Sequence, residues 1–129
     1  MKAAKPWILT LMIGLVSVSA PAVAHHSVSA EFDSNRPIEF TGVVTGVDWL
    51  NPHIYTHVEV QTEDGPVTYR VEGNAPNSLY RRGWRNDSAK VGEIVTGEGI
   101  RARSAESFNL RATLTTADGV VLYQGDAPR

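Results

Sequence analysis

Apolar and polar residues alternate along most of the chain beyond residue 37, a pattern typical of strands that bury one face. From Ile38 to Val44 the even-numbered positions are apolar or glycine, whereas Val47 and Trp49 continue the apolar pattern at odd-numbered positions. A β-bulge adds one residue to a strand and changes its phase in this way. The first strand is therefore predicted to bulge at Thr45-Gly46.

The same alternation predicts a series of strands separated by turn residues. The predicted strands cover residues 38–49, 53–61, 67–71, 93–100, 108–116 and 120–124. Between the third and fourth strands, Asn77–Arg82 is predicted to form a short helix, with Asn74 as its N-cap and Gly83 at the C′ position. Trp84 follows this helix and is expected to pack back on the strands.

Three strands, a short helix and then further strands, with a bulge in the first strand, is the element order of an OB-fold. We therefore predict a mainly β fold, a small five- to six-stranded OB-fold-like barrel with one short helix between strands 3 and 4. A small β-sandwich is the alternative, but the helix argues against it. The barrel domain would cover residues 38–124, after an N-terminal lead-in over 25–37 and before a C-terminal tail over 125–129.

The first 24 residues have the three parts of a cleaved secretory signal peptide. Lys2 and Lys5 form the positive region, residues 7–16 form the apolar region, and Ala22-Val23-Ala24 satisfies the small-residue cleavage rule. The apolar run is shorter than the ~20 residues of a membrane-spanning helix. We predict cleavage after Ala24, export to the periplasm, and no membrane span in the mature chain.

Composition narrows the function further. The sequence contains no cysteine, so packing alone must stabilise the exported domain. The net charge is −2, and it becomes more negative when Lys2 and Lys5 leave with the signal peptide. Nucleic acid is therefore not an expected partner, because binding to phosphates requires clustered Lys and Arg.

All four histidines lie between His25 and His57. Cleavage after Ala24 would make His25 the first residue, so that its α-amine and its imidazole could chelate one metal ion. A further imidazole would complete a histidine brace, and nitrogen-rich tetragonal sites favour Cu(II). His53 after the Asn51-Pro52 turn is the predicted third ligand, and His26 is the reserve ligand. His57 would lie about 13 Å from His53 along the same strand, too far to share the ion.

Other interpretations of these residues stay open. His25 and His26 could belong to a disordered terminus, since terminal residues are commonly poorly ordered. His53 could cap the turn, and the short spacing of zinc motifs is absent. A second candidate site is a ligand groove. Its residues would be Trp49, Asn51, Tyr55, Arg82 and Trp84.

The alternative for the groove is structural, because such aromatic residues more often belong to the core. Arg81 and Arg82, with Arg85, could equally be the solvated end of the helix. Gly97-Glu98-Gly99 lacks the context of a phosphate loop. The serines lack a nucleophile-elbow pattern, and no catalytic residue is predicted.

Several segments together resemble a known family. They are His25-His26-Ser27, Phe32-Asp33, Thr41-Gly42-Val43-Val44, Trp49-Leu50-Asn51-Pro52-His53, Leu79-Tyr80-Arg81-Arg82-Gly83-Trp84 and Val91-Gly92. In these segments the chain is similar to the small exported bacterial proteins of domain-of-unknown-function family 6152. The resemblance implies an exported β-rich domain and implies no activity.

The sequence thus predicts an exported periplasmic accessory domain that binds a small ligand or a metal, with copper as the candidate cofactor. Its partner would be a periplasmic protein or a small ligand. The first alternative is a structural or protein-interaction OB domain without metal. The second is a copper-dependent oxidative enzyme, which is less favoured because a brace alone does not place a substrate. We predict a non-enzyme.

Overall fold

The computed structural model describes residues 28–122. The predicted signal peptide, His25, His26 and the predicted tail lie outside these residues. The described chain contains two short helices and six strands, which are α1 (Val28–Glu31), β1 (Phe32–Asp48), β2 (Tyr55–Thr62), β3 (Gly65–Glu72), α2 (Pro76–Arg81), β4 (Ile94–Ala102), β5 (Asn109–Thr116) and β6 (Val121–Leu122).

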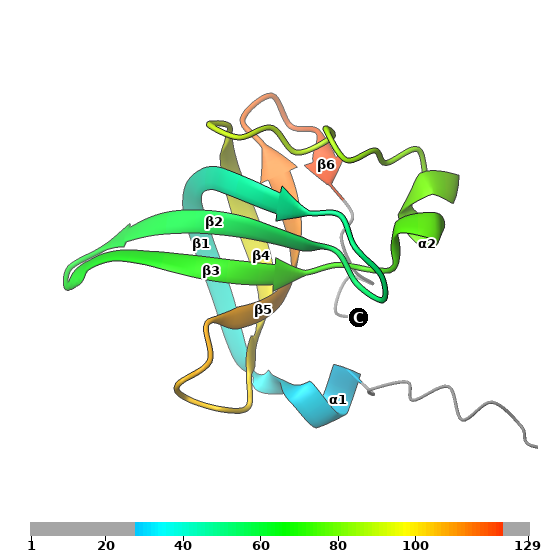
Figure 1. Ribbon diagram of the computed structural model, residues 1–129. Coiled ribbons are helices and arrows are strands. Elements are labelled where there is room, and N and C mark those ends of the chain that lie inside the picture. The colour runs from blue at the N-terminus through cyan, green and yellow to red at the C-terminus, as the bar shows by residue number, and fades with distance from the viewer. Residues whose placement is uncertain (1–27, 123–129) are drawn as a thin grey trace, which may run out of the picture.

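The strands form one sheet in the order β3-β2-β1-β4-β5-β6, and an additional pairing joins β3 to β5 (Figure 1). This pairing closes the first five strands of that order into a ring. Neighbouring strands are antiparallel, except that β3 and β5 are parallel. The mainly β class and the short helix between the third and fourth strands confirm the prediction, and the ring is the closure that an OB-fold-like order requires.

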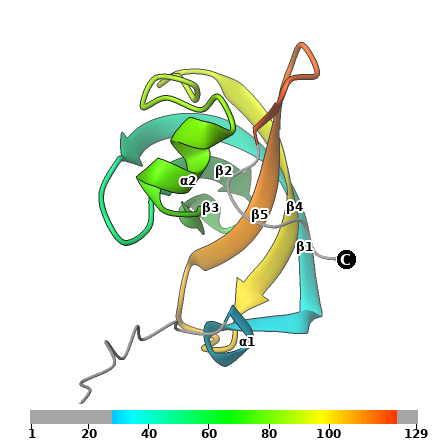
Figure 2. The same cartoon turned by 90° about the vertical axis from the view of Figure 1, so that its right-hand side faces the viewer.

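The core lies inside the ring. It contains the inward residues of the strands, together with Leu79 of α2 and Trp84 just after it. Figure 2 shows α2 in front of β2 and β3. The β1–β2 register shifts between Val44 and Gly46, which confirms the predicted bulge. Beyond the bulge, Val47 and Trp49 pack against the core, as the change of phase requires.

The start of β1 differs from the prediction. The strand begins at Phe32 and not at Ile38, so part of the predicted lead-in is strand. Phe32 is buried and pairs with Ala102 of β4, and the register shifts between Asp33 and Pro37. The polar segment between these two residues interrupts the alternation, which is why the sequence pattern did not extend the strand.

Two local predictions around the second strand and the helix were wrong. The second strand begins at Tyr55, so His53 lies in the β1–β2 connection and not on the strand. Ala75 occupies the N-cap position of α2 without a side-chain cap, whereas Asn74 was predicted there. The Asn74 side chain instead accepts a hydrogen bond from Arg111 at 3.2 Å.

The glycines of Gly97-Glu98-Gly99 have a packing role in β4. Phe40 lies directly across from Gly97, and a Cβ added to Gly97 would come within 2.1 Å of the Phe40 ring. A Cβ on Gly99 would lie 2.1 Å from the backbone oxygen of Arg111 in β5. Only glycine therefore allows β4 to approach these neighbours so closely.

Substitution of Gly99 by alanine should destabilise the ring. The added methyl group meets backbone atoms of β5 that cannot move without breaking strand pairing, and overpacking of this kind costs about 1–3 kcal/mol of unfolding free energy. The melting temperature should fall by on the order of 10 °C. Thermal unfolding followed by circular dichroism measures this. Glu98→Ala, an exposed change on the same strand, should leave the melting temperature nearly unchanged, and equal melting of Gly99→Ala and wild type would contradict the packing argument.

Candidate functional site

A polar pair lies on the outside of the ring where β3 meets β5. Val71 and Leu110 are paired neighbours whose side chains belong to the core, so the next pair, Glu72 and Arg111, points outward. The two side chains are nevertheless buried, with Glu72 5% and Arg111 7% exposed. An Arg111 guanidinium nitrogen lies 3.3 Å from Oε1 of Glu72. Burial of both charges makes this pair the centre of the candidate site.

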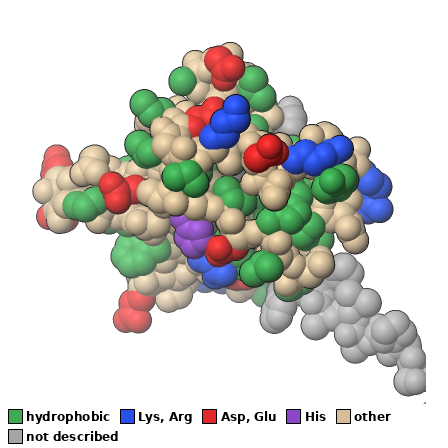
Figure 3. Space-filling view, turned by 45° about the horizontal axis from the view of Figure 1, so that its top comes forward, with side chains coloured by type: hydrophobic (Ala, Val, Ile, Leu, Met, Phe, Trp, Pro, Cys, Tyr) green, Lys and Arg blue, Asp and Glu red, His purple; other side chains and the backbone are tan. Residues whose placement is uncertain are grey.

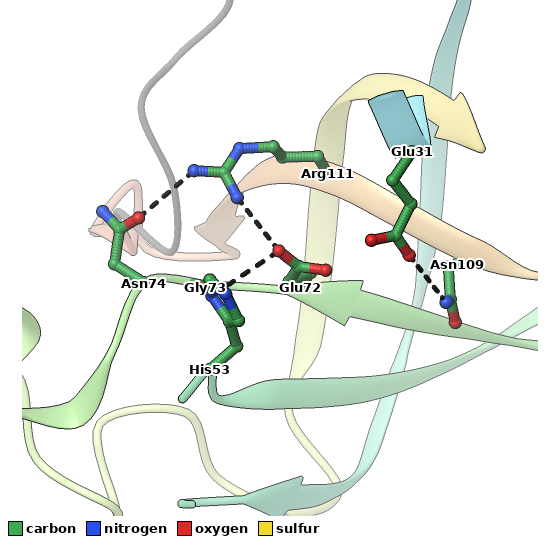
Figure 4. A network of polar contacts seen from close by, with 7 residues as sticks. All are labelled: Glu31, His53, Glu72, Gly73, Asn74, Asn109 and Arg111. Carbon is green, nitrogen blue, oxygen red and sulfur yellow. Dashed lines mark hydrogen bonds and ion pairs between the residues drawn. The ribbon is translucent and has the colours of Figure 1, made fainter. Parts of the chain in front are cut away.

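The pair has further partners around it (Figure 4). Arg111 also donates to Oδ1 of Asn74 at 3.2 Å. On the other side, Nδ1 of His53 lies 3.5 Å from Oε1 of Glu72 and 3.0 Å from the carbonyl oxygen of Gly73. The end of β3 therefore holds His53, which comes from the β1–β2 connection, against the carboxylate.

Four more side chains border the cluster of Glu72, Arg111, Asn74 and His53. Asn109 at the start of β5 donates to Oε1 of Glu31 at 3.3 Å, which ties the end of α1 to the same strand pair. The guanidinium carbon of Arg70 lies 3.5 Å from the centre of the Tyr55 ring on the neighbouring strand. A surface histidine with acidic and basic side chains next to it is visible in Figure 3.

Burial controls the electrostatics of the cluster. It is the largest cause that raises the pKa of the Glu72 carboxyl, and Glu31 adds to the rise, whereas His53 and Arg111 oppose it. The pKa of the Tyr55 hydroxyl is also raised, first by burial and then by the negative charge of Glu72. The site thus keeps a poorly solvated carboxylate beside one imidazole and one guanidinium.

The contact of His53 with Gly73 decides which imidazole nitrogen can bind a ligand. A carbonyl oxygen only accepts hydrogen bonds, so Nδ1 of His53 must carry the proton. In the neutral ring, Nε2 then holds the free electron pair. The His53 side chain is 35% exposed, so this nitrogen belongs to a partly accessible ring. Within residues 28–122, no group of three or more His, Cys, Asp or Glu residues is arranged to hold a metal ion.

The other predicted site residues lie apart from one another. Tyr55 joins His53 at the cluster, whereas Trp84 is in the core and Trp49 packs against it, as the structural alternative had it. Asn51 is exposed in the β1–β2 connection, and Arg82 is the C-cap residue of α2.

His57 lies on β2, where its Nε2 is 2.8 Å from Oδ2 of Asp48. It therefore has a carboxylate partner of its own. Sequence reasoning missed Glu72, Arg111 and Asn74. The available signal was a charged residue directly beside the apolar residues Val71 and Leu110 in two otherwise regular strands.

The fold and the site define a small mainly β domain that carries a buried carboxylate–guanidinium pair and an oriented imidazole on the outside of a five-strand ring. The chain belongs to the family of unknown function DUF6152, whose family model matches residues 12–111. The family membership that the sequence predicted is thereby confirmed. No curated protein and no solved structure matched the chain. Among the helices of residues 28–122, none has the length and apolar character needed to cross a membrane.

The raised pKa of Glu72 predicts how stability depends on pH. The folded protein binds the Glu72 proton more tightly than the unfolded chain does, so Glu72 contributes stability that is present below the ordinary carboxyl pKa of 4.5 and is lost as the pH rises through the raised value. The difference in unfolding free energy, wild type minus Glu72→Gln, should therefore decrease as the pH rises from about 4 to about 7. Urea unfolding of both proteins at about pH 4 and at about pH 7 measures this difference.

In Glu72→Gln the Arg111 charge is left without its carboxylate, which destabilises that variant equally at both pH values. This loss therefore adds a constant to the difference and does not produce its pH dependence. Glu63→Gln, in the exposed β2–β3 turn, is the control and should show a much smaller dependence on pH. A wild-type minus Glu72→Gln difference that is constant with pH would contradict the assignment.

Proposed function

We propose that this protein is an exported periplasmic accessory domain that binds one Cu(II) ion through His53 and the α-amine and imidazole of His25, the first residue of the mature chain. The observation that supports this proposal is the orientation of His53. Its Nδ1 is held 3.0 Å from the Gly73 carbonyl oxygen, which directs the free electron pair to Nε2.

Metal-binding histidines almost always hold their second ring nitrogen in this way. A backbone carbonyl or a carboxylate accepts from the N–H group, fixes the ring and makes the other nitrogen a better ligand. His53 has both partners, Gly73 at 3.0 Å and Glu72 at 3.5 Å. The amine and Nδ1 of His25 would add two more nitrogens, and such a nitrogen-rich set favours Cu(II) over other divalent ions.

The contacts of α1 support the choice of His25 as the partner of His53. Residues 25–27 precede Val28, the first residue of α1, and a fully extended stretch of this length reaches about 10 Å. Glu31 at the end of α1 is bonded to Asn109 and acts electrostatically on Glu72, the residue that contacts His53. His26 is the reserve ligand. We propose binding and not turnover, because three nitrogen ligands by themselves do not place a substrate.

Replacement of His53 should weaken copper binding much more than replacement of His57. Loss of a partner that only orients a ligand costs about 10- to 100-fold in metal affinity, so loss of the ligand itself should cost more than about 100-fold. His57 is the matched control, since its Nε2 is already bonded to Asp48 at 2.8 Å. The affinities of His53→Ala and His57→Ala are measured with the exported, metal-free proteins by competition against a chromophoric chelator. Greater damage by His57→Ala would reject the assignment of His53.

Addition of one glycine before His25 should remove the chelate without changing the fold. The extra peptide unit separates the α-amine from the His25 imidazole, so the two nitrogens no longer close one small chelate ring. Copper affinity should drop sharply, while the thermal transition of the metal-free protein should stay the same. Mass spectrometry of the exported wild-type protein first checks whether its chain starts at His25. Equal copper affinity of the extended and native proteins would rule out the terminal chelate.

A further inference from the structure

Opposite charges gather at two opposite ends of the molecule. The β2–β3 hairpin forms one end, and its turn carries the acidic residues Glu63 and Asp64. The helix α2 lies at the other end (Figure 1), where Arg81, Arg82 and Arg85 are close together in sequence. Figure 3 shows acidic side chains at the hairpin end and basic side chains at the α2 end.

The tip of the hairpin stands clear of the ring. Among the described residues, β1 pairs with β2 only as far as Glu59, and β5 pairs with β3 only from Arg70 onward. Residues 61–66 therefore pair only with one another, and all of them except Gly65 are exposed. We call residues 61–66 the acidic tip. A tip of this kind presents its charges to a partner and not to its own ring.

The α2 end is anchored in the core and presents its arginines outward. Leu79 and Trp84 are buried in the core, so the end of α2 and the turn after it are fixed on the ring. The side chains that lie between and beside these two anchors are exposed. We call them the arginine surface, and they are Tyr80, Arg81, Arg82 and Arg85.

Arg85 is held in place by contacts of its own end. Its guanidinium carbon lies 3.9 Å from the centre of the Tyr80 ring. One guanidinium nitrogen donates to the carbonyl oxygens of Trp84 at 2.8 Å and Tyr80 at 3.2 Å. These contacts occupy a single terminal nitrogen, so the other N–H groups of the guanidinium can donate to a carboxylate. A side chain fixed in this way loses less rotamer entropy when it binds a partner.

Neither set of charges is neutralised by ion pairs of its own chain. Within residues 28–122, no ion pair involves Glu63, Asp64, Arg81 or Arg85. The two sets lie at opposite ends of one molecule, so they cannot meet each other there. Arginine is the side chain best suited to a carboxylate, which it binds through two parallel N–H bonds. This charge complementarity indicates a contact between two copies of the chain.

We propose that the protein associates head to tail, with the acidic tip of one copy docked on the arginine surface of a second copy. This inference does not depend on the proposed copper site. Two different surfaces meet in such a contact, so each bound copy still offers a free tip and a free surface, and short chains form. The contact is small and made by exposed charges, and interfaces below about 1,200 Å² are typical of weak, transient association.

Static light scattering of the exported protein tests this association. The mean mass should rise with protein concentration at low salt. It should return to that of the monomer when NaCl is raised from about 0.02 M to about 0.5 M, because the Debye length falls from about 20 Å to about 4 Å.

Charge reversal of each end identifies the two surfaces. Arg81→Glu with Arg85→Glu reverses the arginine surface, and Glu63→Arg with Asp64→Arg reverses the tip. Each double variant alone should associate about 10-fold or more weakly than wild type, because like charges then face each other. A mixture of the two variants should associate again, since the reversed tip of one meets the reversed surface of the other. The protein with all four substitutions should behave like wild type.

Glu39→Arg with Glu98→Arg is the matched control for the tip. These two residues are exposed, lie opposite each other on β1 and β4, and give the same change in net charge. This control should keep the wild-type association within about threefold, because surface changes away from a site have small effects. Thermal unfolding verifies that each variant folds. If reversal of Arg85 prevents folding, Arg81→Glu with Arg82→Glu replaces that variant and leaves the Arg85 contacts intact.

Several results would overturn the proposal. A wild type that stays monomeric at low salt is one of them. If this monomer instead binds vesicles of phosphatidylglycerol through the same arginines, the arginine surface faces a membrane and not a second copy. The proposal also fails if either reversal leaves association unchanged, if the mixture does not restore it, or if the control loses it equally.

Discussion

The pairing of β3 with β5 is the contact that turns an open sheet into a ring, and the candidate site is built on it. It consists of Arg70, Val71 and Glu72 opposite Asn109, Leu110 and Arg111. The last of these pairs is also a buried ion pair, with 3.3 Å between guanidinium and carboxylate. Loss of one partner of such a pair typically costs about 3–5 kcal/mol, because the other charge stays buried. The closure of the fold and the placement of His53 therefore depend on the same carboxylate.

Because strand side chains alternate, the core and the polar cluster are rigidly connected. Val71 and Leu110 pack inside the ring, and Glu72 and Arg111, one residue further along each strand, face outward. A register slip of one residue would turn the charged side chains into the apolar interior of the ring and the apolar side chains outward. The packing that stabilises the domain thus also fixes the geometry of the cluster, which gives His53 a firm support.

His53 and α1 are held beside the ring in different ways. His53 is held by the end of β3, through Gly73 and Glu72. The helix α1 is attached to the β4–β5 loop and to the start of β5 by hydrogen bonds to Ser29 and Glu31. His53 is therefore supported by the ring itself, whereas α1, none of whose residues is buried, depends on a few hydrogen bonds.

The sequence by itself determined the features that depend on neighbours along the chain: the strand pattern, the bulge at Thr45-Gly46 and the helix after the third strand. It also singled out His53 and Tyr55, both of which interact with Glu72 in the structure. Tertiary structure alone decided the rest. Phe32 extends β1 because it pairs with Ala102, and Asn74 binds Arg111 in place of capping a helix. Glu72 and Arg111 are 39 residues apart and stand where the alternation predicts solvated side chains. Their burial and their contact arise only when β3 and β5 meet, because a local pattern specifies which face a side chain takes but not what covers that face.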